Sequence, residues 1–175
     1  MPSVIGLNSV RIDMTRITVI LATVLSLAFT PLAAQDYQKG LAAARAGDFA
    51  TALQEWKPLA EAGDADAQFQ LGFLHYLGKA VLQDYQEALK WYRLAAEQGY
   101  AKAQSHLGIM YGGGYGVPQD DLMAHMWHNI SAANGDLVAS PMRDIISIGM
   151  TPADISKAQT MARECMNSGY TKCGY

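Results

Sequence analysis

The sequence predicts an all-α protein, an α-solenoid of stacked helical hairpins, and three observations carry this prediction. The stretch from Asp48 to Gln119 consists of two copies of a 36-residue unit, and Asp120 begins a third copy. Alanines and glycines recur at fixed points of the unit, where small residues let two helices approach closely. The middle of the chain is rich in Ala, Leu, Gln and Glu, which favour helices. A fixed period of this length predicts hairpins that bury their apolar faces against their neighbours.

Residues 1–34 have the pattern of a secretory signal peptide. Two arginines precede an apolar run at 17–32, and small residues follow it. This order predicts cleavage after Ala34 and a mature chain in the periplasm or outside the cell. The apolar run covers about 16 residues, short of the roughly 20 that a membrane-spanning helix needs, so we expect no stable span after cleavage. An uncleaved anchor is the alternative, and Met14 is an alternative start that would remove residues 1–13.

The repeat array is predicted to span residues 35–135. A first helix from Tyr37 to Ala46 is expected to pack on the helix that follows Asp48. Each repeated unit then reads as helix, short turn, helix and loop, which gives about seven helices after the signal peptide. Aspartates are favourable N-caps at the start of each unit, and glycines are expected to end the first helix in a left-handed conformation. These residues are Asp48, Asp84 and Asp120, and Gly63, Gly99 and Gly135.

After Gly135 the repeat pattern is lost, and residues 136–175 are predicted to form a C-terminal helical cap. Thr151 is a good N-cap and Pro152 suits the first helical position, so a last helix begins there and runs to about Asn167. Its apolar positions recur at helical spacing and are expected to pack on the final repeat. They are Ile155, Ala158, Met161, Ala162 and Cys165.

Cys165 and Cys173 are the only cysteines in the chain. An even count in an exported protein favours a disulfide, which would close the tail onto the last helix. A loop this short would contribute about 2–3 kcal/mol. A redox pair or a metal site is the alternative. Redox pairs are usually two residues apart, however, and two thiols alone make a poor zinc site.

Three stretches carry a resemblance to a known family: DADAQFQLGFLHYLG, DYQEALKWYRLAAEQG and AKAQSHLGIMYGGGYGVPQD. They resemble the Sel-one-like repeat family, a relative of the tetratricopeptide repeats, in its exported bacterial type. The resemblance covers roughly Tyr37 to Gly135. It implies a right-handed α-superhelix and an adaptor role in protein–protein interaction, without implying a particular partner. The first copy departs from the family pattern in its loop, and the third departs after Gly135.

No group of residues predicts catalysis, a cofactor or a metal. His125 and His128 lie three residues apart on a predicted helix and could share a face with Asp121. We interpret them as packed or partly exposed helix histidines. Ser105 and His106 are adjacent, and adjacent helical residues do not face each other. The glycine-rich run 112–116 lacks the Lys-Ser/Thr of a nucleotide loop. We therefore expect no enzyme activity.

Aromatic residues are the candidates for partner binding. Trp91 and Trp127 occupy the same position of the repeat and are interpreted as packing residues. Tyr76, Tyr111 and Tyr115 fall near helix ends and loops. Because rigid aromatic side chains often act as anchors in interfaces, these tyrosines are the predicted partner-binding residues.

The function predicted from these observations is an exported adaptor or scaffold of the cell envelope that binds a protein or peptide. The net charge of −3 and the lack of a Lys/Arg cluster argue against nucleic acid. One alternative is a cell-wall-associated enzyme of β-lactamase-like type, which the resemblance to cysteine-rich family members implies. The chain has no Ser-x-x-Lys motif, which argues against a serine mechanism. Another is an oligomer stacked through an open repeat end, but the distinct C-terminal cap favours a monomer.

Overall fold

The computed structural model describes residues 36–174, and this part of the chain contains eight α-helices and no strand. The all-α prediction is confirmed, with one helix more than the approximate seven expected, because the segment after Gly135 forms two helices. The predicted signal peptide lies outside the described residues. The helices are α2 (Tyr37–Arg45), α3 (Phe49–Glu61), α4 (Ala65–Leu77), α5 (Tyr85–Glu97), α6 (Ala101–Gly113), α7 (Asp121–Ala133), α8 (Ala139–Ser147) and α9 (Pro152–Asn167).

The repeated aspartates and glycines begin and end the helices as predicted. Each aspartate carboxylate accepts a hydrogen bond from a backbone N–H in the first turn, which satisfies a donor that has no partner within the helix. The caps are Asp48 on Thr51 (3.1 Å), Asp84 on Gln86 (2.9 Å) and Glu87 (3.0 Å), and Asp120 on Met123 (3.0 Å). The glycines that follow α3, α5 and α7 have positive φ angles, namely +99° at Gly63, +82° at Gly99 and +95° at Gly135.

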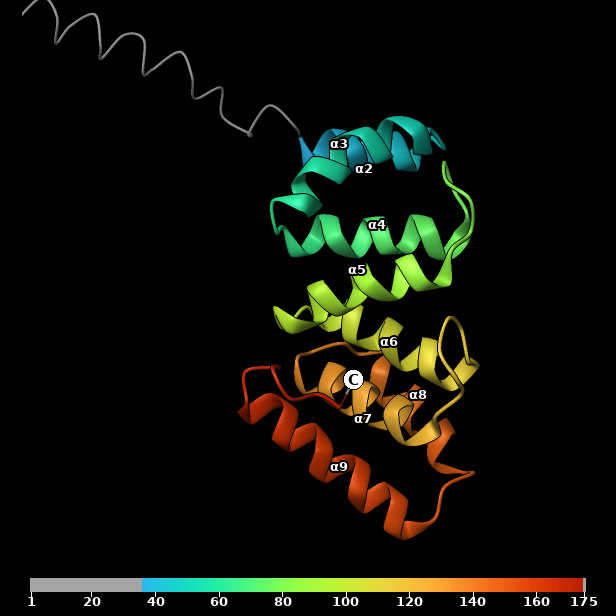
Figure 1. Cartoon of the computed structure of the whole chain (residues 1–175), viewed down its shortest axis with the longest axis vertical. Coiled ribbons are helices and arrows are strands. Elements are labelled where there is room, and N and C mark those ends of the chain that lie inside the picture. The colour runs from blue at the N-terminus through green and yellow to red at the C-terminus, as the bar shows by residue number, and fades with distance from the viewer. Residues whose placement is uncertain (1–35, 175) are drawn as a thin grey trace, which may run out of the picture. The chain divides into compact units, whose positions relative to one another are not determined.

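Successive helices pack on one another from α2 to α7, and Figure 1 shows them stacked along the array. The most extensive contacts join α4 to α5 and α6 to α7, the pairs connected by the longer loops. Helix α2 packs on α3, as predicted. Both α8 and α9 pack on α7, so the two C-terminal helices close that end of the array.

An aromatic ring lies directly on a glycine at three successive helix pairs. The ring position recurs every 36 residues and is occupied by a different ring type each time. A Cβ atom on any of these glycines would lie within 3 Å of the ring, closer than real Cβ contacts, so the ring needs a glycine beneath it. The contacts are Trp56 on Gly40, Tyr92 on Gly72 and His128 on Gly108.

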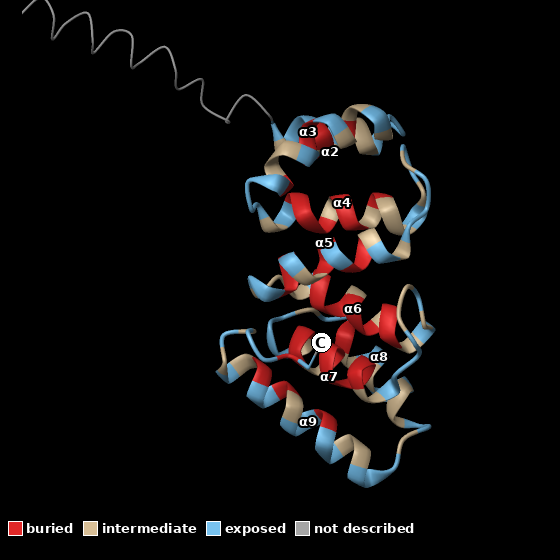
Figure 2. Cartoon of the chain, in the orientation of Figure 1, coloured by how far each residue is buried: buried red, intermediate tan, exposed pale blue. Residues whose placement is uncertain are grey.

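The C-terminal cap has a buried side and an exposed side. The α9 residues Ala158, Ala162 and Cys165 are fully buried, whereas Ile155 and Met161 of the expected stripe are half-buried (Figure 2). Cys165 and Cys173 lie together as a disulfide-capable pair. Helix α8, in contrast, leaves Ile145 61% exposed. None of the helices in residues 36–174 has the length and apolar character needed to cross a membrane.

Candidate functional site

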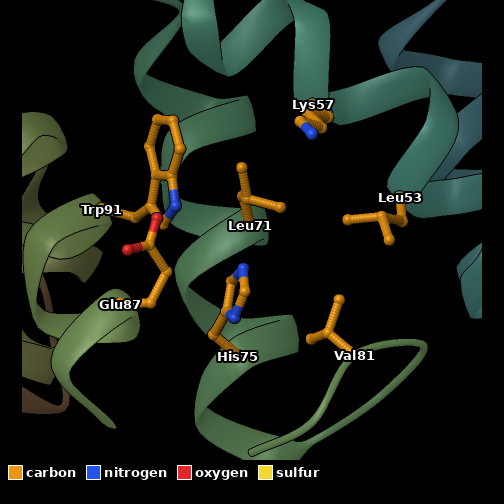
Figure 3. A pocket seen from close by; sticks show the side chains of 7 residues that line it. All are labelled: Leu53, Lys57, Leu71, His75, Val81, Glu87 and Trp91. Atoms are coloured by element: carbon orange, nitrogen blue, oxygen red, sulfur yellow. The ribbon is translucent and has the colours of Figure 1, made fainter. Parts of the chain in front are cut away.

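Three pairs of side chains from three successive helices line a partly open pocket of about 250 Å³ (Figure 3). Residues four apart lie one above the other on the same face of a helix, so each helix contributes two neighbouring side chains. The loop between α4 and α5 adds one more. The lining residues are Leu53 and Lys57 of α3, Leu71 and His75 of α4, Glu87 and Trp91 of α5, and Val81 of the loop.

The pocket combines an apolar wall with polar groups that lack partners. The Trp91 side chain is only 8% exposed, and its Nε1 has no hydrogen-bond partner among the described residues. Figure 3 shows this indole nitrogen on the side of the ring that faces the pocket. The buried Nδ1 of His75 likewise has no partner within residues 36–174. A buried polar atom without a hydrogen-bond partner costs free energy. Both atoms therefore favour a ligand that forms a hydrogen bond with them.

Charge is distributed unevenly around the pocket. The Glu87 carboxylate lies 3.0 Å from the Lys90 ammonium, which partly offsets its charge. The same ammonium lies 5.2 Å from the centre of the Trp91 ring. Lys57 is exposed at the rim and forms no ion pair in the described part of the chain. The pocket therefore offers a positive charge and an indole N–H to an incoming group.

The same seven positions recur 36 residues later, where the side chains are packed more closely. Five of these residues are buried: Leu89, Leu107, Tyr111, Met123 and Trp127. Arg93 replaces Lys57, and its Nη2 donates a hydrogen bond of 2.9 Å to the Tyr111 hydroxyl. Met123 replaces Glu87 and lies against the C-terminal segment, since a Cβ at Gly174 would be 3.7 Å from its sulfur atom. The equivalent space is thus filled by the chain itself.

The predicted partner-binding tyrosines separate into two environments. The ring centres of Tyr76 and Tyr115 lie 5.8 Å apart, and each also contacts Tyr85. Burial, followed by the two neighbouring hydroxyls, raises the pKa of Tyr76. Tyr111 lies apart from this cluster and is 7% exposed, so its ring has little surface to offer a partner. Tyr76 and Tyr115 lie on the surface beside the helix ends, and their binding role stays a prediction.

The histidines considered as metal ligands are core residues. His125 and His128 are 2% and 1% exposed, whereas Asp121 is exposed, and no group of three or more ligating side chains within residues 36–174 could hold a metal ion. Burial lowers the pKa of His128 to about 4 and also lowers the pKa of His125. Desolvation penalises the charged imidazolium, so these rings are neutral at pH 7.

Sequence reasoning did not find the pocket, although it noted some of its members. The repeat position of Trp91 predicts packing, and the sequence assigns no role to His75. The signal lay in differences between equivalent positions: Lys57 against Arg93, His75 against Tyr111, and Glu87 against Met123. These differences become informative only once the three helices are known to meet.

Comparison with known families explains the repeat. The Sel1 repeat model matches residues 65–100 and 101–136. The chain contains two Sel1 repeats. The matched units begin at Ala65 and Ala101, so the family unit pairs α4 with α5 and α6 with α7, the most extensively packed pairs. The predicted unit, which begins at Asp48, describes the same period from a different starting point. Sel1 repeats generally mediate protein–protein interactions.

Solved structures of Sel1-repeat proteins share the fold. The c5321 protein, a protective antigen present in uropathogenic Escherichia coli strains and displaying an SLR fold, is 28% identical with a TM-score of 0.74. The match covers 83% of this chain and 32% of c5321, so the chain spans about a third of that protein's length. A Sel1 repeat protein from Oxalobacter formigenes is 29% identical, with a TM-score of 0.57. The match covers 65% of this chain and 87% of that protein. No curated protein sequence matches the chain.

Proposed function

We propose that the protein is an exported adaptor or scaffold of the cell envelope that binds a protein or peptide partner. The observation that carries the proposal is the pocket between α3, α4 and α5, in which Trp91 and His75 present polar atoms without partners. The interaction role of Sel1 repeats supports it. The signal-peptide pattern of residues 1–34 and the cysteine pair support export.

An enzymatic role has less support from the same residues. Ser105, the candidate nucleophile, is 5% exposed, and the ring of its neighbour His106 packs 5.0 Å from the Phe69 ring. The His106 Nδ1 lies 3.0 Å from the Lys102 carbonyl oxygen. Burial lowers the pKa of His106. These two side chains are held by packing in the array, which favours a binding function.

Two measurements test the proposal. The first is mass spectrometry of the protein recovered from the periplasm or medium of the source organism. The expected N-terminus is Gln35, and recovery of the intact chain from the cytoplasm alone would refute export. The second is cross-linked affinity capture from the cell envelope. A specific protein enriched over an unrelated exported bait is expected, and equal recovery with both baits would refute the adaptor role.

A further inference from the structure

The chain supplies an internal comparison for what the pocket could hold. At the interface one repeat later, the segment after α9 turns back across α7 (Figure 1). Asn134, at the end of α7, donates a hydrogen bond of 2.8 Å from Nδ2 to the Tyr170 hydroxyl. Gly174 lies against Met123 at the start of α7, and Cys173 is 3% exposed. A short irregular segment of chain, made of turns and bends, therefore covers the position equivalent to Glu87.

In the pocket, by contrast, the corresponding position is open. Leu53 and Val81 are only half-buried, whereas Leu89, the equivalent of Leu53, is 3% exposed. The apolar wall suits one aliphatic side chain. A volume of about 250 Å³ is below the range of about 300–1,000 Å³ typical of drug-sized ligands, so the pocket suits a single residue of a longer segment.

The polar groups around the pocket that lack partners among the described residues are hydrogen-bond donors, and they favour a carboxylate as the ligand. Trp91 Nε1 can only donate a hydrogen bond, and the Lys57 ammonium carries a positive charge with three donors. His75 Nδ1 can donate in the appropriate tautomer. Glu87 would repel an anion, but Lys90 lies 3.0 Å from its carboxylate and offsets this charge. Hydrogen bonds between charged donors and carboxylates are roughly twice as strong as neutral ones, so an acidic group satisfies the site better than an amide.

We propose that the pocket between α3, α4 and α5 binds an extended segment of a partner protein through an aliphatic side chain next to a carboxylate. The side chain contacts Leu53, Leu71 and Val81, and the carboxylate accepts from Lys57 and Trp91. The inference rests on the proposed adaptor function and names the chemistry of its partner. A C-terminal carboxylate and an acidic side chain share this chemistry.

The direct test is a titration of the 15N-labelled protein by NMR. The chain has three tryptophans, and the variant Trp91→Phe identifies the indole signal of Trp91 by its loss. N-acetyl-leucine is the probe, because it joins an aliphatic side chain to a carboxylate. It is expected to shift the Trp91 signal with a dissociation constant of about 1 mM, a usual affinity for a ligand of this size. N-acetyl-leucinamide, which lacks the charge, should bind about tenfold more weakly.

Variants locate the interaction. Lys57→Gln should weaken N-acetyl-leucine about fivefold and reduce its advantage over the amide. Lys157→Gln makes the same charge change on the exposed face of α9 and should leave the affinity unchanged. Glu87→Gln removes a negative charge from the pocket and should tighten binding. Equal binding of the acid and the amide, or no shift of the Trp91 signal at twenty times the expected constant, would overturn the proposal.

Two further arms separate the possible outcomes. N-acetyl-leucine presents a terminal carboxylate, and N-acetyl-Leu-Asp-amide presents a side-chain carboxylate, so the tighter ligand identifies the source. Envelope capture is repeated with the Lys57→Gln protein as bait. Loss of the captured partner supports the pocket as its site. Full recovery of that partner would overturn the pocket inference while the adaptor function stands. If N-acetyl-leucine binds and the wild-type bait captures nothing specific, the adaptor function fails.

Discussion

The interface formed by α3, α4 and α5 and the interface formed by α5, α6 and α7 are built from equivalent residues, yet one contains a pocket and the other is filled. Leu53 and Leu89 occupy the same repeat position, and so do Leu71 and Leu107. In the first interface Leu53 is half-buried, whereas Leu89 is 3% exposed in the second. The helices are therefore arranged alike in the two interfaces, but the side chains fill the space between them differently.

The difference lies in what covers each interface. Arg93 and Tyr111 form a hydrogen bond across the second interface, and the C-terminal segment lies on Met123. At the equivalent positions of the first interface, Lys57 and His75 form no such bond, and no other part of residues 36–174 fills the space. A solenoid can therefore use one interface for stability and its neighbour for binding.

The largest expected difference comes from truncating one leucine in each interface. Leu89→Ala leaves a cavity in a filled core and should lower the free energy of unfolding by about 3 kcal/mol. Leu53→Ala removes a half-buried side chain from the edge of an open pocket and should cost about 1 kcal/mol. Urea unfolding followed by circular dichroism measures both. Equal losses of unfolding free energy would show that the two interfaces are packed alike, and would contradict the difference in packing described above.

A smaller loss is expected from adding one methyl group beneath a buried ring. A Cβ at Gly108 would lie 2.7 Å from the ring of His128, which is 1% exposed and cannot move aside freely. Gly108→Ala should therefore cost about 2–3 kcal/mol of unfolding free energy through overpacking. Gly112→Ala on the same helix is the control, because its Cβ would meet Ala124 at an ordinary 3.5 Å. That control should be neutral or stabilising by up to about 1 kcal/mol.

Acid should destabilise the filled interface through His128. Burial lowers the pKa of this residue to about 4, whereas an unfolded chain has a histidine pKa of about 6.5. Both states are neutral at pH 7, so the full stability is present there. As the pH falls from about 6.5 towards 5, the unfolded state binds a proton that the folded state does not, and about 2 kcal/mol of unfolding free energy is lost.

The variant His128→Tyr tests this assignment, because Tyr92 occupies the equivalent position on Gly72. Relative to its own stability at pH 7, the variant should lose less unfolding free energy at pH 4.5 than the wild-type protein. His106 and His125, whose pKa values are also lowered by burial, account for the slope that remains. An unchanged slope would mean that His128 is not the group that titrates.

Much of the fold could be predicted from the sequence, because its signals are local. Asp84 and Gly99 mark helix ends by backbone chemistry that depends on one turn of chain, and the structure confirms both. Even one tertiary bond follows the period, since Gln68 and Gln104 each donate 3.1 Å hydrogen bonds to carbonyl oxygens eight residues earlier. Cys165 and Cys173 also lie close enough to form the disulfide that the sequence predicts.

The site could not be predicted in the same way. Tyr111 and Tyr76 both fall near helix ends in the sequence, but the first is buried against Arg93 and the second contacts Tyr85 and Tyr115. Whether a repeat position is open depends on side-chain volumes from three helices and on the path of the C-terminal segment. No local pattern encodes that combination, so equivalent residues gave no indication of which interface would hold a pocket.

The smallest expected change in stability comes from rebuilding the first interface with residues of the second. The triple variant Lys57→Arg, His75→Tyr and Glu87→Met should form an arginine–tyrosine hydrogen bond like that of Arg93 and Tyr111, and gain less than about 1 kcal/mol. Its larger side chains should occupy the space for an aliphatic ligand, so N-acetyl-leucine should no longer shift the Trp91 indole signal. Unfolding and NMR titration are measured on the same samples.

The single variant Lys57→Arg is the matched control, because it keeps the positive charge and leaves His75 in place. It should retain binding within about threefold, since arginine also donates to carboxylates. Continued binding by the triple variant would show that the open pocket is not the ligand site. If the triple variant loses binding and Lys57→Arg keeps it, the three exchanged side chains are enough to close an interface. No C-terminal segment like the one on Met123 would then be needed. The same repeat position would then be a binding pocket or a packed core according to three side chains.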